Sequence, residues 1–322
     1  MTDVSGVTAE ELLINRSNTI LTGTASTFDR IEGNSGYLKI VVAPVVAGGK
    51  LAIDGGLQIE ADTALDWTGA AVSITNGVSL THARGYVGGL TLSADTIVID
   101  ADSRIDVSGR GYGLDGPGHA NWRTGASYGG QGGPVPGYPV QPVYGNALQP
   151  SSLGSGDTDI YGGGAVKVVA NGLVLDGKIF SYGNASHRND VGGASGGSIW
   201  LEVGALSGSG SIAADGGAGR NYNGTNDSSA GGGGGRIAIY YGGVSGFDLA
   251  TQTHAYGGVG YAGYPAGENG TIHLQDASGP TRIIASTTSG ELAEPVSEIT
   301  VRFDVAVDAA TFTPADVTIT GP

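Results

Sequence analysis

The chain has 322 residues, of which 61 are glycine, 12 are proline and none is cysteine, and its formal net charge is −15. Glycine follows no strict three-residue period, which excludes collagen, and it costs about 1 kcal/mol per helical position relative to alanine, which disfavours a mainly helical protein. The acidic balance disfavours nucleic acid and anionic membranes as partners, and the lack of cysteine removes thiolate chemistry and cysteine-bound zinc. No apolar stretch approaches the roughly 18 residues of a membrane span. The composition predicts an all-β protein of short strands and glycine-rich loops.

The first ninety residues predict short strands with short connections. Apolar residues recur at strand-like spacing in four stretches: Ile31 to Ala43, Gly49 to Ile59, Ala64 to Ile74 and Val78 to Thr81. Segment 8–22, which precedes them, is expected to cap the end of the sheet, because an uncovered strand edge invites pairing with another chain. The first residues hold neither the basic nor the apolar region of a secretion signal.

From residue 89 onward, glycine-led strands recur. They open at Gly89, Gly164, Gly197, Gly235 and Gly270, and the last four openings lie 33, 38 and 35 residues apart. A short apolar piece and another strand follow each opening, before a glycine-rich loop. Units that cannot bury an apolar face alone stack into a solenoid. Three short strands per unit predict a right-handed parallel β-helix over residues 1–280.

Glycine-rich stretches interrupt the repeat. The longest, 108–162, holds six of the twelve prolines and five tyrosines, and we expect it to be one large excursion lying along the side of the solenoid. Shorter loops at 184–196, 217–234 and 257–269 leave from corresponding corners, so they should stack into one flank. Close backbone packing of extended, polyproline-II-like strands would order these loops, because glycine has no side chain to bury.

The composition changes after about residue 280. Glycine becomes rarer, and residues 297–304 and 316–320 show the alternation of half-buried strands. Some 40 residues are too few for a β-sandwich of about 100. Residues 281–322 are therefore predicted to be a truncated Ig-like segment or a C-terminal cap.

Several stretches resemble a known class of protein. The segments at 144–156, 164–179, 196–217 and 232–241, with sequences such as GGSIWLEVGALSGSGSIAADGG and GGGGRIAIYY, resemble the glycine-rich β-helical regions of very large, adhesin-like bacterial surface or secreted proteins. The tail from Pro295 to Pro322 is similar to the opening of the bacterial Ig-like modules that follow such regions. The resemblance covers roughly residues 85–322. It implies an extracellular or cell-surface location and no catalytic residue.

The β-helix fold also carries polysaccharide lyases and hydrolases, which need carboxylates clustered on neighbouring coils. Asp106 and Asp215 align with Phe180 and Tyr182, respectively, in the intervening coil. No carboxylate ladder is expected, and no catalytic residue is predicted. The run Gly232–Arg236 lacks the Gly-Lys-Ser/Thr ending and the following helix of a phosphate loop.

Two sets of loop residues are candidates for binding. Aromatic side chains on a glycine-rich flank can stack on sugar rings or glue the loops together, and these are Tyr112, Trp122, Tyr128, Tyr138, Tyr144, Tyr222, Tyr261 and Tyr264. Hard oxygen ligands suited to Ca²⁺, the one cofactor the sequence suggests, occur at Asp157, Asp159, Asn221, Asn223 and Asp227. Polar surface loops would have the same composition.

The predicted function is a non-enzymatic structural or adhesive segment of a large extracellular bacterial protein. It would be a rigid rod whose loop flank contacts glycans, partner proteins or copies of itself. One alternative is a polysaccharide lyase or hydrolase of the β-helix type. A second is a flat-face binder such as an ice-binding solenoid, although regular Thr-x-Thr ladders are missing.

Overall fold

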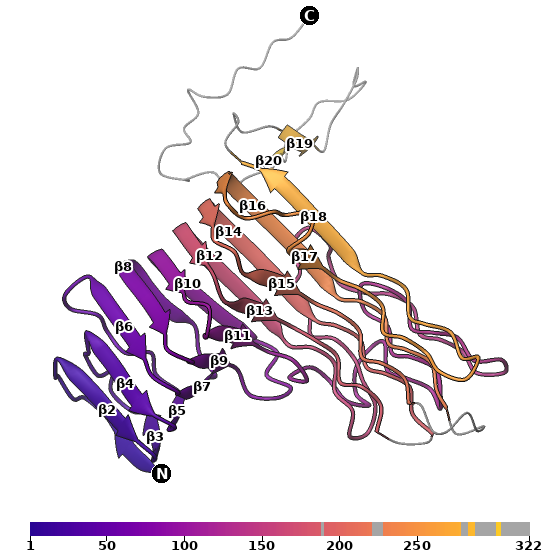
Figure 1. Cartoon of the computed structure of the whole chain (residues 1–322), viewed down its shortest axis with the longest axis horizontal. Coiled ribbons are helices and arrows are strands. Elements are labelled where there is room, and N and C mark those ends of the chain that lie inside the picture. Colours follow the sequence, from indigo (N-terminus) through magenta and orange to yellow (C-terminus); the bar gives the residue numbers. More distant parts are fainter. Residues whose placement is uncertain (188–189, 221–227, 278–282, 287–300, 304–322) are drawn as a thin grey trace, which may run out of the picture.

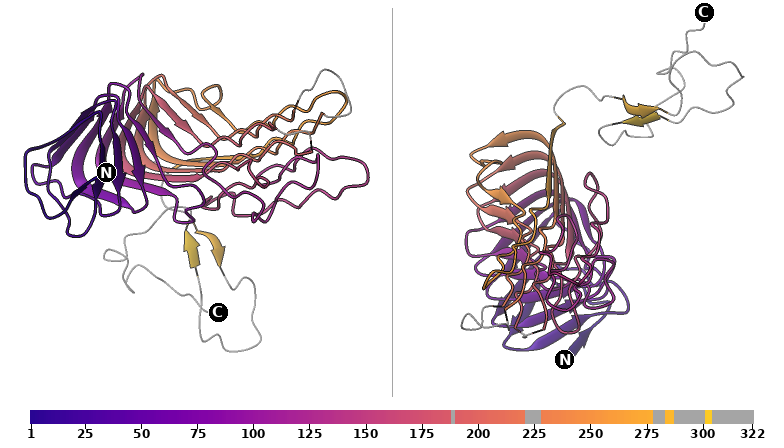
Figure 2. Two further views of the ribbon diagram at one scale, coloured as in Figure 1. Left: turned by 90° about the horizontal axis from the view of Figure 1, so that it is seen from below. Right: turned by 90° about the vertical axis from the view of Figure 1, so that its right-hand side faces the viewer.

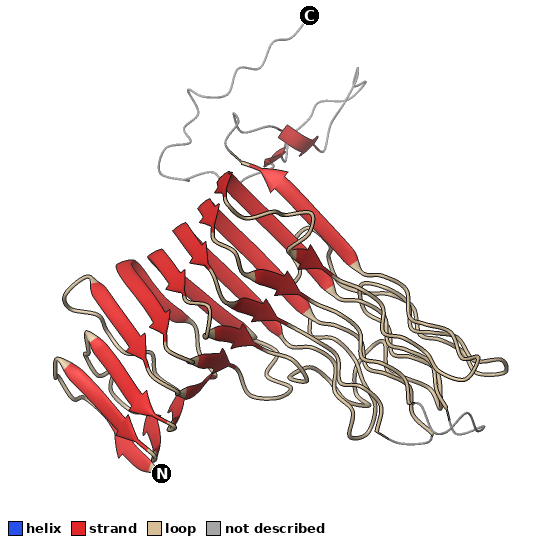
Figure 3. Ribbon diagram, in the orientation of Figure 1, coloured by secondary structure: helices blue, strands red, loops and turns tan. Residues whose placement is uncertain are grey.

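The computed structural model describes residues 1–187, 190–220, 228–277, 283–286 and 301–303 (Figure 1). These residues form strands, turns and loops, with no helix among them (Figure 3). The same ranges accordingly contain no helix that could span a membrane. Two nine-stranded sheets dominate, and every neighbouring pair of strands within them is parallel. The chain therefore winds as a stack of coils, the architecture of a parallel β-solenoid.

Each coil contributes one strand to each sheet. At about 4.8 Å per step, nine strands make a stack roughly 38 Å long. One sheet holds β1 (Thr2–Val4), β3 (Asn18–Leu21), β5 (Tyr37–Ile40), β7 (Gln58–Ala61), β9 (Ser79–Thr81), β11 (Arg104–Asp106), β13 (Lys178–Phe180), β15 (Ser211–Ala213) and β17 (Thr253–His254). The other holds β2 (Glu11–Asn15), β4 (Arg30–Asn34), β6 (Lys50–Asp54), β8 (Leu65–Thr75), β10 (Leu90–Ile99), β12 (Ala165–Leu175), β14 (Ser198–Ser207), β16 (Arg236–Ser245) and β18 (Thr271–Asp276).

The core lies between the sheets and is built of stacked aliphatic side chains. Ile53, Ile74, Ile99 and Leu175 occupy matching positions of four successive strands and are at most 1 % exposed. Burial of each such side chain stabilises the fold by about 1.5–3 kcal/mol. Branched side chains pack well on a pleated surface. Because only one face of each strand contacts this core, apolar residues alternate along the strands, and this alternation predicted them in the sequence.

The coils have two strands where the sequence predicted three. The first two predicted strands of a coil run as one long strand, as in β10, which turns a corner without breaking its pairing. Ala94 and Ile97 are buried, whereas Asp95 and Thr96 between them are not. Two successive outward residues bend the strand, and the pairing with β8 shifts register at that point.

The prediction of an N-terminal cap at 8–22 is wrong. These residues form β2 and β3, ordinary coil strands that pair with β4 and β5. Ile14 is fully buried, whereas Leu13 points outward and is 65 % exposed, so the segment has the two-residue alternation of a strand.

The glycine-rich excursions leave one side of the stack and run together away from it (Figure 2). Backbone hydrogen bonds join them into one structure, here called the glycine bundle: 111–164, 183–187, 190–197, 214–220, 228–235 and 255–270. The expected single flank is confirmed. The longest excursion does not lie along the side of the solenoid as expected. It folds back and forth within the bundle, because its own glycines supply the close backbone contacts that the neighbouring loops need.

The hydrogen bonds of the bundle repeat every three residues. Along 230–235, three successive N–H groups donate to three different neighbouring segments. The fourth N–H donates to the same segment as the first, and the pattern then repeats. A polyproline II helix has three residues per turn, so each segment can bond to three neighbours at once. The pairs are Ala230 to Arg123 and Gly233 to Ala126, Gly231 to Pro265 and Gly234 to Glu268, and Gly232 to Gly217 and Gly235 to Ala214.

This packing has no room for side chains at its centre. A β-carbon on Gly232 would overlap the carbonyl oxygen of Ala194, and one on Gly233 would overlap that of Gly130. The expectation that glycine runs order by backbone packing is therefore confirmed, and the glycine content has a structural cause.

Residues 281–322, predicted to be a truncated Ig-like segment or a cap, lie mostly outside the described residues. Only β19 (Ile283–Ser286) and β20 (Val301–Phe303) are described there, and they pair antiparallel.

Candidate functional site

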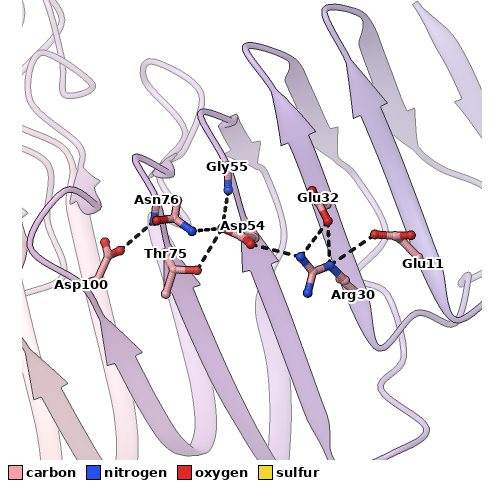
Figure 4. Close-up of polar contacts among 8 residues, drawn as sticks. All are labelled: Glu11, Arg30, Glu32, Asp54, Gly55, Thr75, Asn76 and Asp100. Carbon is pink, nitrogen blue, oxygen red and sulfur yellow. Dashed lines mark hydrogen bonds and ion pairs between the residues drawn. The ribbon is translucent and has the colours of Figure 1, made fainter.

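Carboxylates on the outer face of the coils are tied into lateral networks. In the largest, Arg30 lies 3.2 Å from Glu11, 2.7 Å from Glu32 and 3.1 Å from Asp54 (Figure 4). Asp54 also accepts hydrogen bonds from the next coil, from Asn76 Nδ2 at 2.6 Å and Thr75 Oγ1 at 3.2 Å.

The network determines the charge state of Asp54. The hydrogen bond from Asn76, followed by those from Gly55 and Thr75, holds the pKa of Asp54 below its usual value. A general acid of a glycosidase needs a carboxyl whose pKa is raised. Asp54 thus has the electrostatics of a structural acceptor that joins neighbouring coils.

A second network surrounds Lys39. Its Nζ lies 3.1 Å from Glu60 Oε1 and 2.8 Å from Asp62 Oδ2, and Arg110 approaches Glu60 at 3.5 Å. The hydrogen bonds to Asp62 and Glu60 raise the pKa of Lys39. A lyase base must be neutral to take a proton, and this lysine is held in its charged form.

The carboxylates of the short strands lie where the sequence predicted. Asp106 pairs with Phe180 of the next coil. Burial, followed by the negative charges of Asp215 and Asp106, raises the pKa of the Tyr182 phenol. Asp215 Oδ1 is 2.8 Å from His254 Nδ1 and also accepts from Tyr256 N at 2.7 Å. The predicted alignment of Asp106 with Phe180 is confirmed, whereas the Asp215–His254 pair was not foreseen.

The glycine run next to Arg236 is fully engaged. The N–H groups of Gly232, Gly233, Gly234 and Gly235 all donate to backbone carbonyls of the bundle, so none is left to cradle a phosphate. The Arg236 side chain is buried and donates to Tyr144 O and Thr271 Oγ1.

Two of the predicted binding tyrosines pack against each other. Tyr128 is completely buried, and its hydroxyl lies 2.6 Å from Ser198 Oγ. Tyr144 packs on it at 4.8 Å between ring centroids, and its hydroxyl donates to Leu153 O. Burial raises the pKa of both phenols. The prediction that Tyr128 contacts a ligand is wrong, because this ring is completely buried at the base of the bundle. Tyr144 is partly exposed, and its role in binding stays a prediction.

Three other predicted aromatics meet at the far end of the bundle, where tight turns end its segments. Trp122 and Tyr138 stack at 4.3 Å between centroids with an interplanar angle of 23°. Arg123, which the sequence reasoning missed, lies 4.5 Å over the indole and donates from Nη1 to Tyr264 Oη at 3.2 Å. We call Trp122, Arg123, Tyr138 and Tyr264 the tip cluster.

Three turns position the tip cluster. In Val135-Pro136-Gly137-Tyr138, proline precedes a glycine with φ of 85°, the pattern of a type II turn. Residues 261–264 turn through positive φ at Ala262 and Gly263. In 121–124, the Thr124 hydroxyl accepts from Asn121 N and donates to Asn121 O. These local bonds fix the directions in which the rings project.

Three aromatic candidates remain outside the tip cluster as defined: Tyr112, Tyr261 and Tyr222. Tyr112 is half-buried in the body of the bundle, where its N–H donates to Gly154 O. Tyr261 begins the 261–264 turn, and its N–H donates to Ser229 O. Tyr222 lies outside the described residues.

The predicted calcium ligands do not converge within the described residues, which hold no group of three or more potential metal-ligating side chains. Asp157 accepts from the N–H and hydroxyl of Thr158, and Asp159 lies 3.4 Å from His187 Nε2. Asn221, Asn223 and Asp227 lie outside the described residues.

Comparison of the chain with protein-family models, with curated proteins and with solved structures finds no match. Function is therefore argued from the coils, the bundle and the tip cluster alone.

Proposed function

We propose that this chain is a non-enzymatic structural or adhesive segment of a large extracellular bacterial protein. It would act as a rigid rod that holds a glycine- and tyrosine-rich flank against glycans, partner proteins or copies of itself. The extracellular location, the right-handed winding and an Ig-like module in 281–322 are parts of the proposal that rest on the sequence.

The observation that supports it best is the glycine bundle. Its hydrogen bonds join segments far apart in sequence, such as Gly233 to Ala126 and Gly129 to Gly234. Backbone packing of this kind holds exposed turns at a fixed distance from the coils, which suits presentation of a contact surface more than enclosure of a substrate.

The outer faces of the coils give less support to a polysaccharide lyase or hydrolase. Asp54 and Lys39 have displaced pKa values within the two large polar networks, and partners on neighbouring coils hold both in their charged forms. Neither can serve as the neutral acid or neutral base that such an enzyme requires.

Two measurements on the purified chain test the proposal. Binding is screened on a microarray of microbial, plant and animal glycans with and without Ca²⁺, and self-association is followed by analytical ultracentrifugation. In parallel, turnover of acidic polysaccharides is followed by the ultraviolet absorbance of unsaturated uronates, which a lyase forms, and by the release of reducing ends, which a lyase or a hydrolase forms. We expect binding or self-association without turnover. Turnover that disappears in an Asp-to-Asn variant would overturn the proposal in favour of an enzyme.

A further inference from the structure

The tip cluster holds exposed aromatic surface at a place where the fold does not need it. Trp122 is 37 % and Tyr138 40 % exposed, although both rings are large and apolar. The segments behind them pack through backbone atoms, so no core requires these side chains. Single exposed apolar residues are common on surfaces and need no explanation, whereas aromatic side chains that three turns bring together form a continuous contact surface.

The backbone of Trp122 supplies an independent observation. Its φ is 55°, in the left-handed region that bulky residues rarely occupy. Glycine would adopt this conformation without strain, yet the chain places its most exposed tryptophan there. A strained residue that persists at an exposed turn is typical of a functional site.

The cluster is also held in place before any ligand arrives. The carbonyl of Arg123 accepts from Ala230 N, and Gly231 N donates to Pro265 O beside Tyr264. Gly133 N, two residues before the Val135 turn, donates to Gly231 O. Three turns from two separate excursions are thus bonded to one central segment, and a pre-organised site loses little entropy on binding.

The chemistry of the cluster fits one class of ligand. Tyr138 and Arg123 already lie over the indole of Trp122, so the aromatic surface left for the apolar C–H face of a pyranose ring is the side of Tyr138 turned away from Trp122 and the exposed edge of the indole. The Tyr264 hydroxyl, which accepts from Arg123, can donate to a sugar hydroxyl. We infer that the tip cluster of Trp122, Arg123, Tyr138 and Tyr264 is a carbohydrate-binding site for pyranose-containing oligosaccharides. This inference rests on the proposed adhesive role and assigns its contact point.

The test uses the full chain and the glycans that it retains on the microarray, with cellohexaose and chitohexaose as soluble probes. Trp122→Gly removes the indole and suits the positive φ, so this variant should fold at least as stably as the parent. Tyr138→Ala removes the other ring. Tyr256→Ala is the matched control, because Tyr256 is also exposed and stacked, on His254 near the base of the bundle.

We expect each tip variant to weaken glycan binding at least about tenfold, the effect of losing an aromatic anchor, with Tyr256→Ala unchanged. Binding that survives in both tip variants overturns the site and leaves the adhesive role standing. A parent chain that binds no glycan also overturns it. The proposed function is then judged separately by self-association and by the absence of turnover.

Discussion

Gly232 and Gly243 belong to the same coil, but their surroundings differ. Gly232 faces the carbonyl of Ala194 in the bundle, whereas a β-carbon on Gly243, in the exposed part of β16, would have no atom within 4 Å. The two positions therefore separate the effect of steric space from that of backbone flexibility.

We predict opposite effects for alanine at these positions. Gly232→Ala should lower the free energy of unfolding by about 1–3 kcal/mol, the usual cost of overpacking. Gly243→Ala should leave it unchanged or raise it by about 0.4–1 kcal/mol, because it restricts the unfolded chain. Urea unfolding of both variants measures the difference. Equal stability of the two would contradict the packing of the bundle.

His82 is a second residue with a measurable consequence. It is fully buried, its Nδ1 is 2.7 Å from Ala83 O, and its Nε2 accepts from Ala165 N at 3.2 Å. Burial lowers the pKa of the imidazole below 6.5, so the folded state holds it neutral.

Stability should consequently depend on pH in the range where histidine titrates. Below about pH 6.5 the unfolded chain binds a proton that the folded chain does not. The free energy of unfolding is therefore highest above that pH and falls by up to about 1.4 kcal/mol per pH unit as the pH decreases. Urea unfolding at about pH 7.5 and 5.5 measures this slope. His82→Gln should flatten it at lower overall stability, and the exposed His187→Gln should retain it; an unchanged slope in His82→Gln would refute the assignment.

At the scale of the element, the coils are joined by side chains as well as by strand pairing. Asp54 accepts from Thr75 and Asn76 of the following coil, and Asp100 of the coil after that accepts from Asn76 N at 2.7 Å. Asp176 likewise accepts from Ser209 N and its hydroxyl. Side-chain hydrogen bonds thus join the corners after β6, β8 and β10, and separately those after β12 and β14.

Removing the charge of Asp54 should weaken these hydrogen bonds. Asp54→Asn should lower the free energy of unfolding by about 1–2 kcal/mol at neutral pH, because hydrogen bonds to an ionised group are the stronger ones. The pKa of Asp54 lies below 3.8, so the difference from the parent should persist at neutral pH and vanish as the pH falls through the folded pKa. Thermal unfolding at several pH values checks this, with the exposed Asp102→Asn as control. A constant difference down to strongly acidic pH would argue against it.

Much of the element structure was predictable, for physical reasons. Stretches such as Leu51–Ile53 and Leu90–Leu92 alternate because one face is buried, and the glycines before the strands mark corners. The sequence predicts two separate strands on either side of Asp95, whereas the structure has one continuous strand that bends there. This could not be predicted, because polar residues occur both where a strand bends and where it ends. The sequence also cannot distinguish Tyr128, which is buried, from Tyr138, which is exposed, because both are tyrosines close to glycine. Only the path of 111–164 through the bundle decides which of the two is buried.

The tip cluster, too, could be predicted from the sequence only in part. The Pro136-Gly137 pair marks a turn in the sequence, and the aromatic candidates included Trp122, Tyr138 and Tyr264. Their meeting with Arg123 depends on backbone bonds from 230–231 to two distant turns, and composition holds no information about such pairings.

At the scale of the whole molecule, the 111–164 excursion acts as a brace. Its segments at 123–133 bond to 228–235 and 265–270, which lie two and three turns further along the stack. The first and last residues of the excursion also lie together, since Gly111 N donates to Gly162 O at 2.7 Å. A short linker can therefore replace 112–161 without stretching the coils.

Such a replacement should loosen only part of the molecule. We expect amide hydrogen exchange to rise strongly in 228–235 and 265–270 and to stay unchanged in β2 through β9, whose core does not involve the bundle. Hydrogen-exchange mass spectrometry of the parent and the shortened chain measures both regions, and the strands serve as internal control. Unchanged protection of 228–235 would show that the excursion is not a brace.

The three-residue period of the bundle has a last consequence for how the chain finds its fold. Glycine segments look alike after a slide of three residues, so backbone bonds alone would accept several alignments of equal quality. Tyr128 is fully buried, and its hydroxyl lies against Ser198. It distinguishes the native alignment from the others, because a slide of three residues would remove its ring from this buried position. The buried tyrosines thus fix the register of the glycine segments. The uniqueness of the native alignment depends on a few aromatic rings among many interchangeable glycines.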